Sequence, residues 1–199
     1  DPAAAIGKDA RDVAGYDLTP FLDDYVQVTW QGVNAACYAL IAAREGGITL
    51  RNEDAYLSYI LDGLADEQMS SDMAYADYLA FGLEALSFYD DRPEAAEFIE
   101  KTVEVLSGLQ AEDASFGNCE STAEVIVGLT MAGIDPAADP RFVKSGGSLA
   151  DGLFLFYDGE EGFKHLAEDE DINWMSCEKA LLALDAEELF KNGKKLYGE

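Results

Sequence analysis

The sequence predicts an all-α fold, because apolar residues recur at helical spacing throughout and sustained strand-like alternation is almost absent. Segments that are apolar nearly all round alternate with segments that carry one polar face, as in helical hairpins whose outer helices shield an inner row. The leucines that close the inner segments, Leu40, Leu86, Leu129 and Leu184, are separated by 46, 43 and 55 residues. A period in the forties with paired helices indicates about four hairpins of a solenoid or toroid.

The first expected helices lie near the start of the chain. Thr19 and Pro20 form a cap followed by a proline in the first turn, which predicts a helix over 20–27. A second helix is expected from Gln31 to Arg44, ending at the glycine pair 46–47.

The next hairpin is expected to join an outer helix to an inner one. Asn52 can cap a helix that places Tyr56, Tyr59, Ile60 and Leu64 on one face. The segment from Ala74 to Leu86 is apolar nearly all round, so we expect an inner helix there.

The second half repeats this alternation. A longer outer helix is expected over Pro93–Gln110, with glutamates on its wet face and an apolar stripe formed by Ala96, Ile99, Val103, Leu106 and Leu109. Ala123–Met131 and Lys179–Leu184 are apolar nearly all round and are expected to be inner helices, buried on more than one side.

Composition limits the partners. Thirteen Lys and Arg against 40 Asp and Glu give a net charge of −27, which excludes nucleic acid and anionic lipid surfaces by repulsion. No apolar run reaches the ~18 residues that a membrane span needs, so no membrane insertion is expected in this fragment.

The opening Asp1-Pro2-Ala3 is typical of a cut point, and we expect any export signal to lie upstream. Three cysteines without metal-type spacing are interpreted as buried free thiols.

Several stretches resemble one family over most of the chain, from about Gly15 to Tyr197. They are Gln31–Asn34, Tyr38–Ala42, Asn118–Pro136, Asp139–Lys144, Gly162–His165 and Asn192–Tyr197. They resemble the prenyltransferase and squalene-oxidase repeat domains of bacterial, mostly Gram-positive, cell-surface proteins.

The resemblance implies an α/α toroid like that of terpenoid cyclases, protein prenyltransferase β subunits and transcobalamin-like proteins. We therefore expect residues 1–199 to form a single toroid domain, an incomplete α6/α6 barrel that is the C-terminal part of a larger one. The resemblance also implies a secreted or surface-anchored location, with signal and anchor outside this fragment.

The residues for the two best-known chemistries of that fold are missing. A prenyltransferase zinc site needs an Asp two residues before a Cys, but Gly117 and Met175 hold those places, so no metal site is expected. A cyclase needs an Asp-x-Asp-Asp run, and the nearest, Asp169-Glu170-Asp171, continues with Ile172. We therefore expect no catalytic residues, and interpret this acidic run as a solvated loop.

Polar residues at the starts of the inner helices are the expected ligand-binding site. Gln31, Asp77 and Glu120 each stand nine residues before an anchor leucine, a place that Met175 fills in the last repeat. Inner helices of a toroid bring such positions to one mouth of the cavity. The full expected set is Gln31, Asn34, Asp77, Glu120, His165 and Trp174. The alternative is that the acids only stabilise helix N-termini.

The favoured function is a non-catalytic extracellular binding or adhesion module with a central cavity for a small ligand. Its expected partner is a small molecule or a surface glycan or protein, and no cofactor is required. Calcium is a candidate cation, because Asp77 and Glu120 brought together without a partner would repel and recruit one. Two alternatives stay open: an enzyme of the terpenoid cyclase, prenyltransferase or glycan-processing type, and a corrinoid-binding protein of transcobalamin type.

Overall fold

The computed structural model describes residues 11–12, 15–69 and 72–197, and the regular elements in these ranges are all helices. The only β pairings there are isolated bridges, between Lys144 and Gly147 and between Tyr157 and Phe163. The predicted all-α class is confirmed over the described chain.

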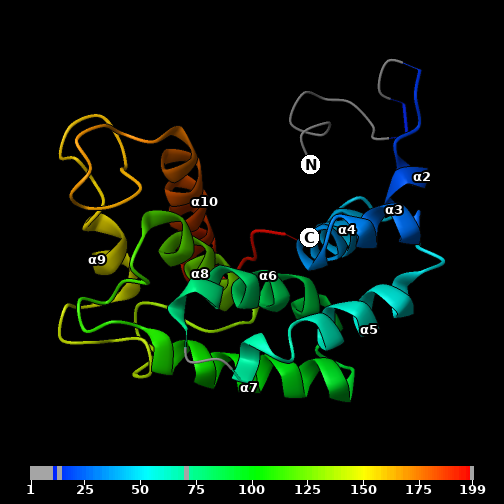
Figure 1. Cartoon of the computed structure of the whole chain (residues 1–199), viewed down its shortest axis with the longest axis horizontal. Coiled ribbons are helices and arrows are strands. Elements are labelled where there is room, and N and C mark those ends of the chain that lie inside the picture. Colours follow the sequence, from blue (N-terminus) through cyan, green and yellow to red (C-terminus); the bar gives the residue numbers. More distant parts are fainter. Residues whose placement is uncertain (1–10, 13–14, 70–71, 198–199) are drawn as a thin grey trace.

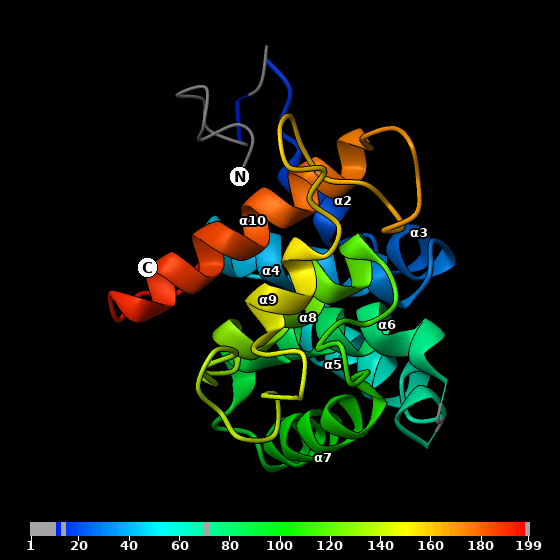
Figure 2. The same cartoon turned by 90° about the vertical axis from the view of Figure 1, so that its left-hand side faces the viewer.

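Four helices form an inner row: α4 (Val33–Glu45), α6 (Ala76–Leu86), α8 (Cys119–Met131) and α10 (Trp174–Lys191). Each packs against the next one in the row. The longer outer helices α5 (Glu53–Gly63) and α7 (Pro93–Leu109) pack against α4 and α6 respectively and lie along one side of the row (Figure 1). Turned by 90°, the molecule shows α7 at the bottom and α10 above it, with α8 and α9 between them (Figure 2).

Shorter elements complete the fold. They are α2 (Thr19–Leu22), α3 (Tyr25–Trp30), α9 (Leu149–Phe154) and the 3₁₀ turns Glu67–Met69, Met73–Tyr75 and Ser87–Tyr89. Helix α9 packs against α8, and α3 packs against α4.

Helix α8 is the centre of the molecule. All its residues are buried except Glu120, which confirms the inner helix predicted over Ala123–Met131. A Cβ added at Gly128 would come within 2.9 Å of the carbonyl oxygen of Ala80, so the backbones of α6 and α8 approach closely. Helix α6 contributes to both apolar cores, one shared with α8 and α10 and the other with α4 and α5.

The helix predicted over 20–27 is divided in two. Helix α2 begins at Thr19, one residue earlier than expected, and ends before Asp23. The Asp23 carboxylate accepts hydrogen bonds from the backbone N–H groups of Arg51 and Asn52, which draws this residue to the start of α5. The Asp24 side chain then caps a new helix, α3.

Helix α4 begins at Val33 rather than at Gln31. Gly32 has φ of 99°, a left-handed conformation that ends α3 and separates it from α4. Gln31 is therefore the last residue of the preceding turn, while the predicted end of α4 near Arg44 is confirmed to within one residue.

The stripe predicted for α7 is confirmed at Val103 and Leu106, but toward the start of the helix the most buried positions are Ala95 and Phe98, one residue before the predicted Ala96 and Ile99. The buried residues of α7 are Ala95, Phe98, Thr102, Val103 and Leu106. Gln68 donates to the carbonyl oxygen of Phe98, and the Phe98 ring packs under Gly82 of α6, which turns this face of α7 inward.

The prediction that Lys179–Leu184 is buried on more than one side is wrong. Ala180 and Ala183 are fully buried, but Leu181 on the opposite face is 61% exposed. Among the described helices, α10 packs mainly against α8, so only one of its sides is covered.

Candidate functional site

Three ionisable side chains from neighbouring inner helices meet inside the helix row. The ammonium of Lys179 on α10 lies 2.7 Å from Oε2 of Glu124 on α8. The carboxyl group of Glu84 on α6 is hydrogen-bonded to Glu124. Glu84 and Glu124 are 1% and 3% exposed. We call Glu84, Glu124 and Lys179 the inner cluster.

Two members of the inner cluster occupy the same position of the helical repeat. Glu124 and Lys179 each stand five residues before an anchor leucine, and Phe81 holds the same place in α6. The Lys179 ammonium lies 5.3 Å from the centroid of the Phe81 ring, so it contacts a carboxylate and an aromatic face together.

Burial decides the protonation of the inner cluster. It raises the pKa of Glu84 well above the usual value, and the charge of Glu124 and the hydrogen bond to it act in the same direction. Burial lowers the pKa of Lys179, because it disfavours the charged ammonium. The charge of Glu124 and its hydrogen bond to Lys179 have a larger opposite effect, so the pKa of Lys179 is raised. A hydrogen bond between two carboxyl groups needs one proton, and the raised pKa of Glu84 favours that residue as its donor. Oε1 of Glu84 is buried and receives no hydrogen bond from a described donor.

A more exposed rim surrounds the cluster. Tyr38 of α4 is 45% exposed, and its ring packs edge-on against Phe81 with centroids 5.2 Å apart. Partial burial, followed by the charges of Glu124 and Glu84, raises the pKa of the Tyr38 hydroxyl. Burial also raises the pKa of Asp77 in the first turn of α6, and the charge of Glu124 adds to this. Asp77 therefore belongs to the rim.

The segment that follows α10 completes the rim. Residues 192–197, here called the return segment, run from α10 back toward α4 (Figure 1). Tyr197 packs against both apolar cores. Burial and the charges of Glu84 and Glu124 raise the pKa of its hydroxyl, which places Tyr197 beside the inner cluster.

Two of the expected site residues are brought into contact. Nδ1 of His165 lies 2.6 Å from Oε2 of Glu120, and the hydroxyl of Ser176 donates to Oε1 of Glu120 over 2.6 Å. The expectation that Glu120 would face Asp77 without a partner is therefore wrong, because both its oxygens are occupied. Trp174, two residues before Ser176, is 82% exposed.

The contacts of the remaining expected residues lie elsewhere. The side chain of Gln31 donates to the carbonyl oxygen of Gln27, within its own turn. Asn34 stands in the first turn of α4, where its Oδ1 is buried without a described partner. Asp77 interacts with the inner cluster instead. Five of the six expected residues thus fall in three places: the α3–α4 junction, the inner cluster and the Glu120–His165 pair. The sixth, Trp174, is exposed at the start of α10.

The Glu120–His165–Ser176 group does not have the arrangement of an activated nucleophile. Such a site needs the hydroxyl bonded to a base, whereas Ser176 is fully buried and donates to the same carboxylate that His165 contacts. The backbone N–H of Cys119 also donates to the carbonyl oxygen of His165. These bonds fasten the loop before α10 to the start of α8.

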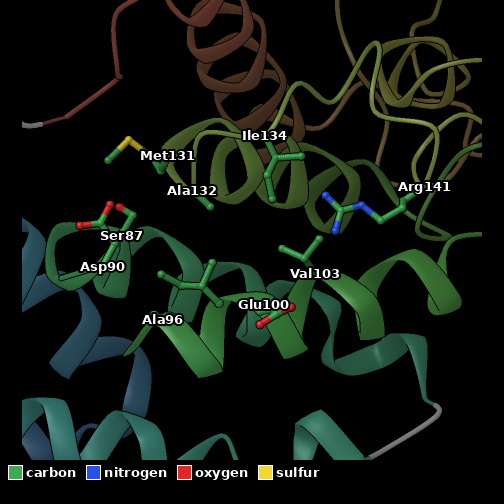
Figure 3. A pocket seen from close by; sticks show the side chains of 10 residues that line it. Ser87, Asp90, Ala96, Glu100, Val103, Met131, Ala132, Ile134 and Arg141 are labelled. Atoms are coloured by element: carbon green, nitrogen blue, oxygen red, sulfur yellow. The ribbon is translucent and has the colours of Figure 1, made fainter. Parts of the chain in front are cut away.

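A separate cavity of about 200 Å³ lies between α7 and the end of α8 (Figure 3). Its walls include Ala96, Ile99, Val103 and Met131, with Arg141 at one side. Arg141 is bonded to Asp139 at 2.7 Å and to Glu104 at 3.4 Å, so its charge is already compensated. The cavity is smaller than ordinary ligand sites of ~300 Å³ or more.

Within the described ranges, no group of three or more His, Cys, Asp or Glu side chains could hold a metal ion. No described helix is long and apolar enough to cross a membrane. No protein-family model, curated protein or solved structure matches the chain.

Sequence reasoning missed the inner cluster because it looked at the first turn of each inner helix. Glu124 and Lys179 lie one turn further along, and Glu84 lies about two turns beyond Asp77. Counting five residues back from the anchor leucines, instead of nine, would have found Glu124 and Lys179 as charged residues in otherwise apolar segments.

Proposed function

We propose that this chain is a non-catalytic binding module of a secreted or surface-anchored protein, which takes a small ligand on its inner helices. The observation that carries the proposal is the convergence of polar side chains from α4, α6, α8 and α10 on one place. Buried ionisable groups lose hydration, and apolar replacements of similar size are often as stable or more so. Their collection beside the exposed Tyr38 and the half-buried Asp77 therefore favours a binding role over a purely structural one.

The proposal includes an incomplete α/α toroid as the architecture. In support, the inner helices follow one another along the chain with outer helices between them, as the family resemblance implies. The exposed face of α10 at Leu181 fits the edge of an open ring.

Binding is favoured over glycan hydrolysis by the spacing of the carboxyl groups. A glycosidase holds its two carboxyls about 5–9.5 Å apart, on either side of the scissile bond. Glu84 and Glu124 are hydrogen-bonded to each other, which leaves no room for a sugar between them.

An NMR screen with cationic, anionic and neutral small molecules at millimolar concentration tests the proposal. We expect hits whose chemical-shift changes map to Tyr38, Asp77 and Lys179. The matched control replaces the inner cluster by Glu84→Leu, Glu124→Leu and Lys179→Met, and should lose those hits while remaining folded. Hits that persist in this variant, or a screen in which no compound shifts these residues, would overturn the proposal.

A further inference from the structure

We propose that the ligand of this site is an organic cation, bound through an ammonium group between Asp77, Glu124 and the rings of Tyr38 and Phe81. This inference rests on the proposed function and names the class of ligand.

The charge balance of the site favours a cation. Carboxyl groups from Asp77, Glu124 and the nearby Glu178 outnumber the one ammonium, that of Lys179. The Asp77 carboxylate accepts the backbone N–H groups of Tyr78 and of Asp77 itself, and no salt bridge to a cation of the described chain reaches it. The net charge of −27 also concentrates cations near the whole surface.

Lys179 already shows how an ammonium is held here. Its Nζ lies 2.7 Å from Glu124 and 5.3 Å from the centre of the Phe81 ring. A carboxylate beside an aromatic face is the usual combination for ammonium recognition. Tyr38, which packs edge-on against Phe81, extends the aromatic wall toward solvent.

The unsatisfied oxygen of Glu84 is an independent observation that points to a ligand. Its Oε1 is a buried acceptor that no described group donates to, which is costly unless a donor arrives. A ligand N–H can supply that donor. The bound cation would also favour the ionised form of Glu84, so binding should release a proton.

The surroundings of Glu84 support this linkage. The titratable groups that face it are Glu124 of α8, Lys179 of α10, Cys37 and Tyr38 of α4, and Tyr197 of the return segment. On the side of α6 toward α5 and α7, Leu64 and Phe98 pack at Gly82. The titratable groups around Glu84 therefore come from the inner helices and the return segment, and none of those named comes from α5 or α7.

Calorimetric titration of the full chain with benzylammonium, benzyl alcohol and benzoate tests the inference. We expect benzylammonium to bind at least about tenfold more tightly than benzyl alcohol, with no binding of benzoate. Its affinity should rise with pH, with proton release seen by comparing buffers of different ionisation enthalpy. Asp77→Asn should weaken binding about fivefold or more, and Glu84→Gln should abolish the proton release.

The matched control is Glu94→Gln on the exposed face of α7, which makes the same change in net charge and should leave binding unchanged. Three results would overturn the cation inference. They are equal affinity for benzyl alcohol and benzylammonium, the same loss of affinity in Glu94→Gln as in Asp77→Asn, and no binding of benzylammonium. If the cation inference fails but neutral or anionic compounds shift the NMR signals of Tyr38 and Asp77, the proposed binding function is still supported.

Discussion

The ammonium of Lys179 and the carboxylate of Glu124 lie 2.7 Å apart, and both residues occupy the same position of the helical repeat, five before an anchor leucine. The pair joins α10 to the central helix α8. Glu124 is also hydrogen-bonded to Glu84, so one carboxylate links three inner helices.

Replacing Lys179 by Met should therefore destabilise the fold strongly. The change leaves the Glu124 charge buried without its counter-ion, a loss of about 3–5 kcal/mol in comparable buried pairs. Chemical denaturation at neutral pH measures it. Lys191→Met is the matched control, because Lys191 pairs with Glu187 across one helical turn with its side chain 53% exposed, and it should cost ~0.5 kcal/mol or less. Equal losses for the two variants would contradict the assignment.

The stability of the protein should depend on Glu84 through pH. The pKa of Glu84 is raised in the folded state, so the folded chain binds more protons than the unfolded chain between the ordinary value of 4.5 and the raised pKa. The contribution of Glu84 is fully present below pH 4.5 and is lost as pH rises through that window.

Glu84→Gln keeps the shape of the protonated acid and should remove this dependence. The free energy of unfolding of the variant should approach that of the wild type in acid and exceed it at neutral pH. Denaturant melts across the pH range check this, and parallel pH profiles for the two proteins would show that Glu84 ionises normally.

Two glycine substitutions should have opposite effects. Gly128→Ala in α8 places a Cβ 2.9 Å from the carbonyl oxygen of Ala80 in α6, and this contact between backbones should cost about 1–3 kcal/mol. Gly108→Ala in α7 meets no atom within 4 Å and should stabilise the protein by about 0.5–1 kcal/mol through helix propensity. Thermal denaturation of both variants gives the signs, and a gain in stability from Gly128→Ala would contradict the close approach of α6 and α8.

Cys37 and Cys119 should resist alkylation in the native protein. Burial and then nearby carboxylates raise the pKa of both thiols, that of Cys119 to about 12. Very little thiolate is then present at pH 8, and both side chains are fully buried. Iodoacetamide labelling followed by mass spectrometry should show modification of these two residues only after unfolding. Labelling of either one at the rate of a denatured control would contradict their burial.

Local patterns in the sequence were sufficient for the longer helices, although they gave neither the break between α2 and α3 nor the short helix α9. The all-round apolar run in Ala123–Met131 predicted an inner helix, since a segment without a polar face must be covered on all sides. The C-terminal end of α4 was predicted from the glycine pair that follows it, and the start of α7 was predicted from Pro93. Both residue types act on the backbone within a few residues.

Side-chain pairing was decided by the tertiary structure. Glu84 meets Glu124 across 40 residues and Lys179 meets Glu124 across 55, and no local pattern sets such distances. The segments Ala123–Met131 and Lys179–Leu184 are both apolar nearly all round, but the first lies in α8, which is covered on both sides, and the second in α10, which is covered on one. Hydrophobic spacing states which face of a helix can be buried, but the partner that buries it, and the charges that meet there, depend on how neighbouring helices cross.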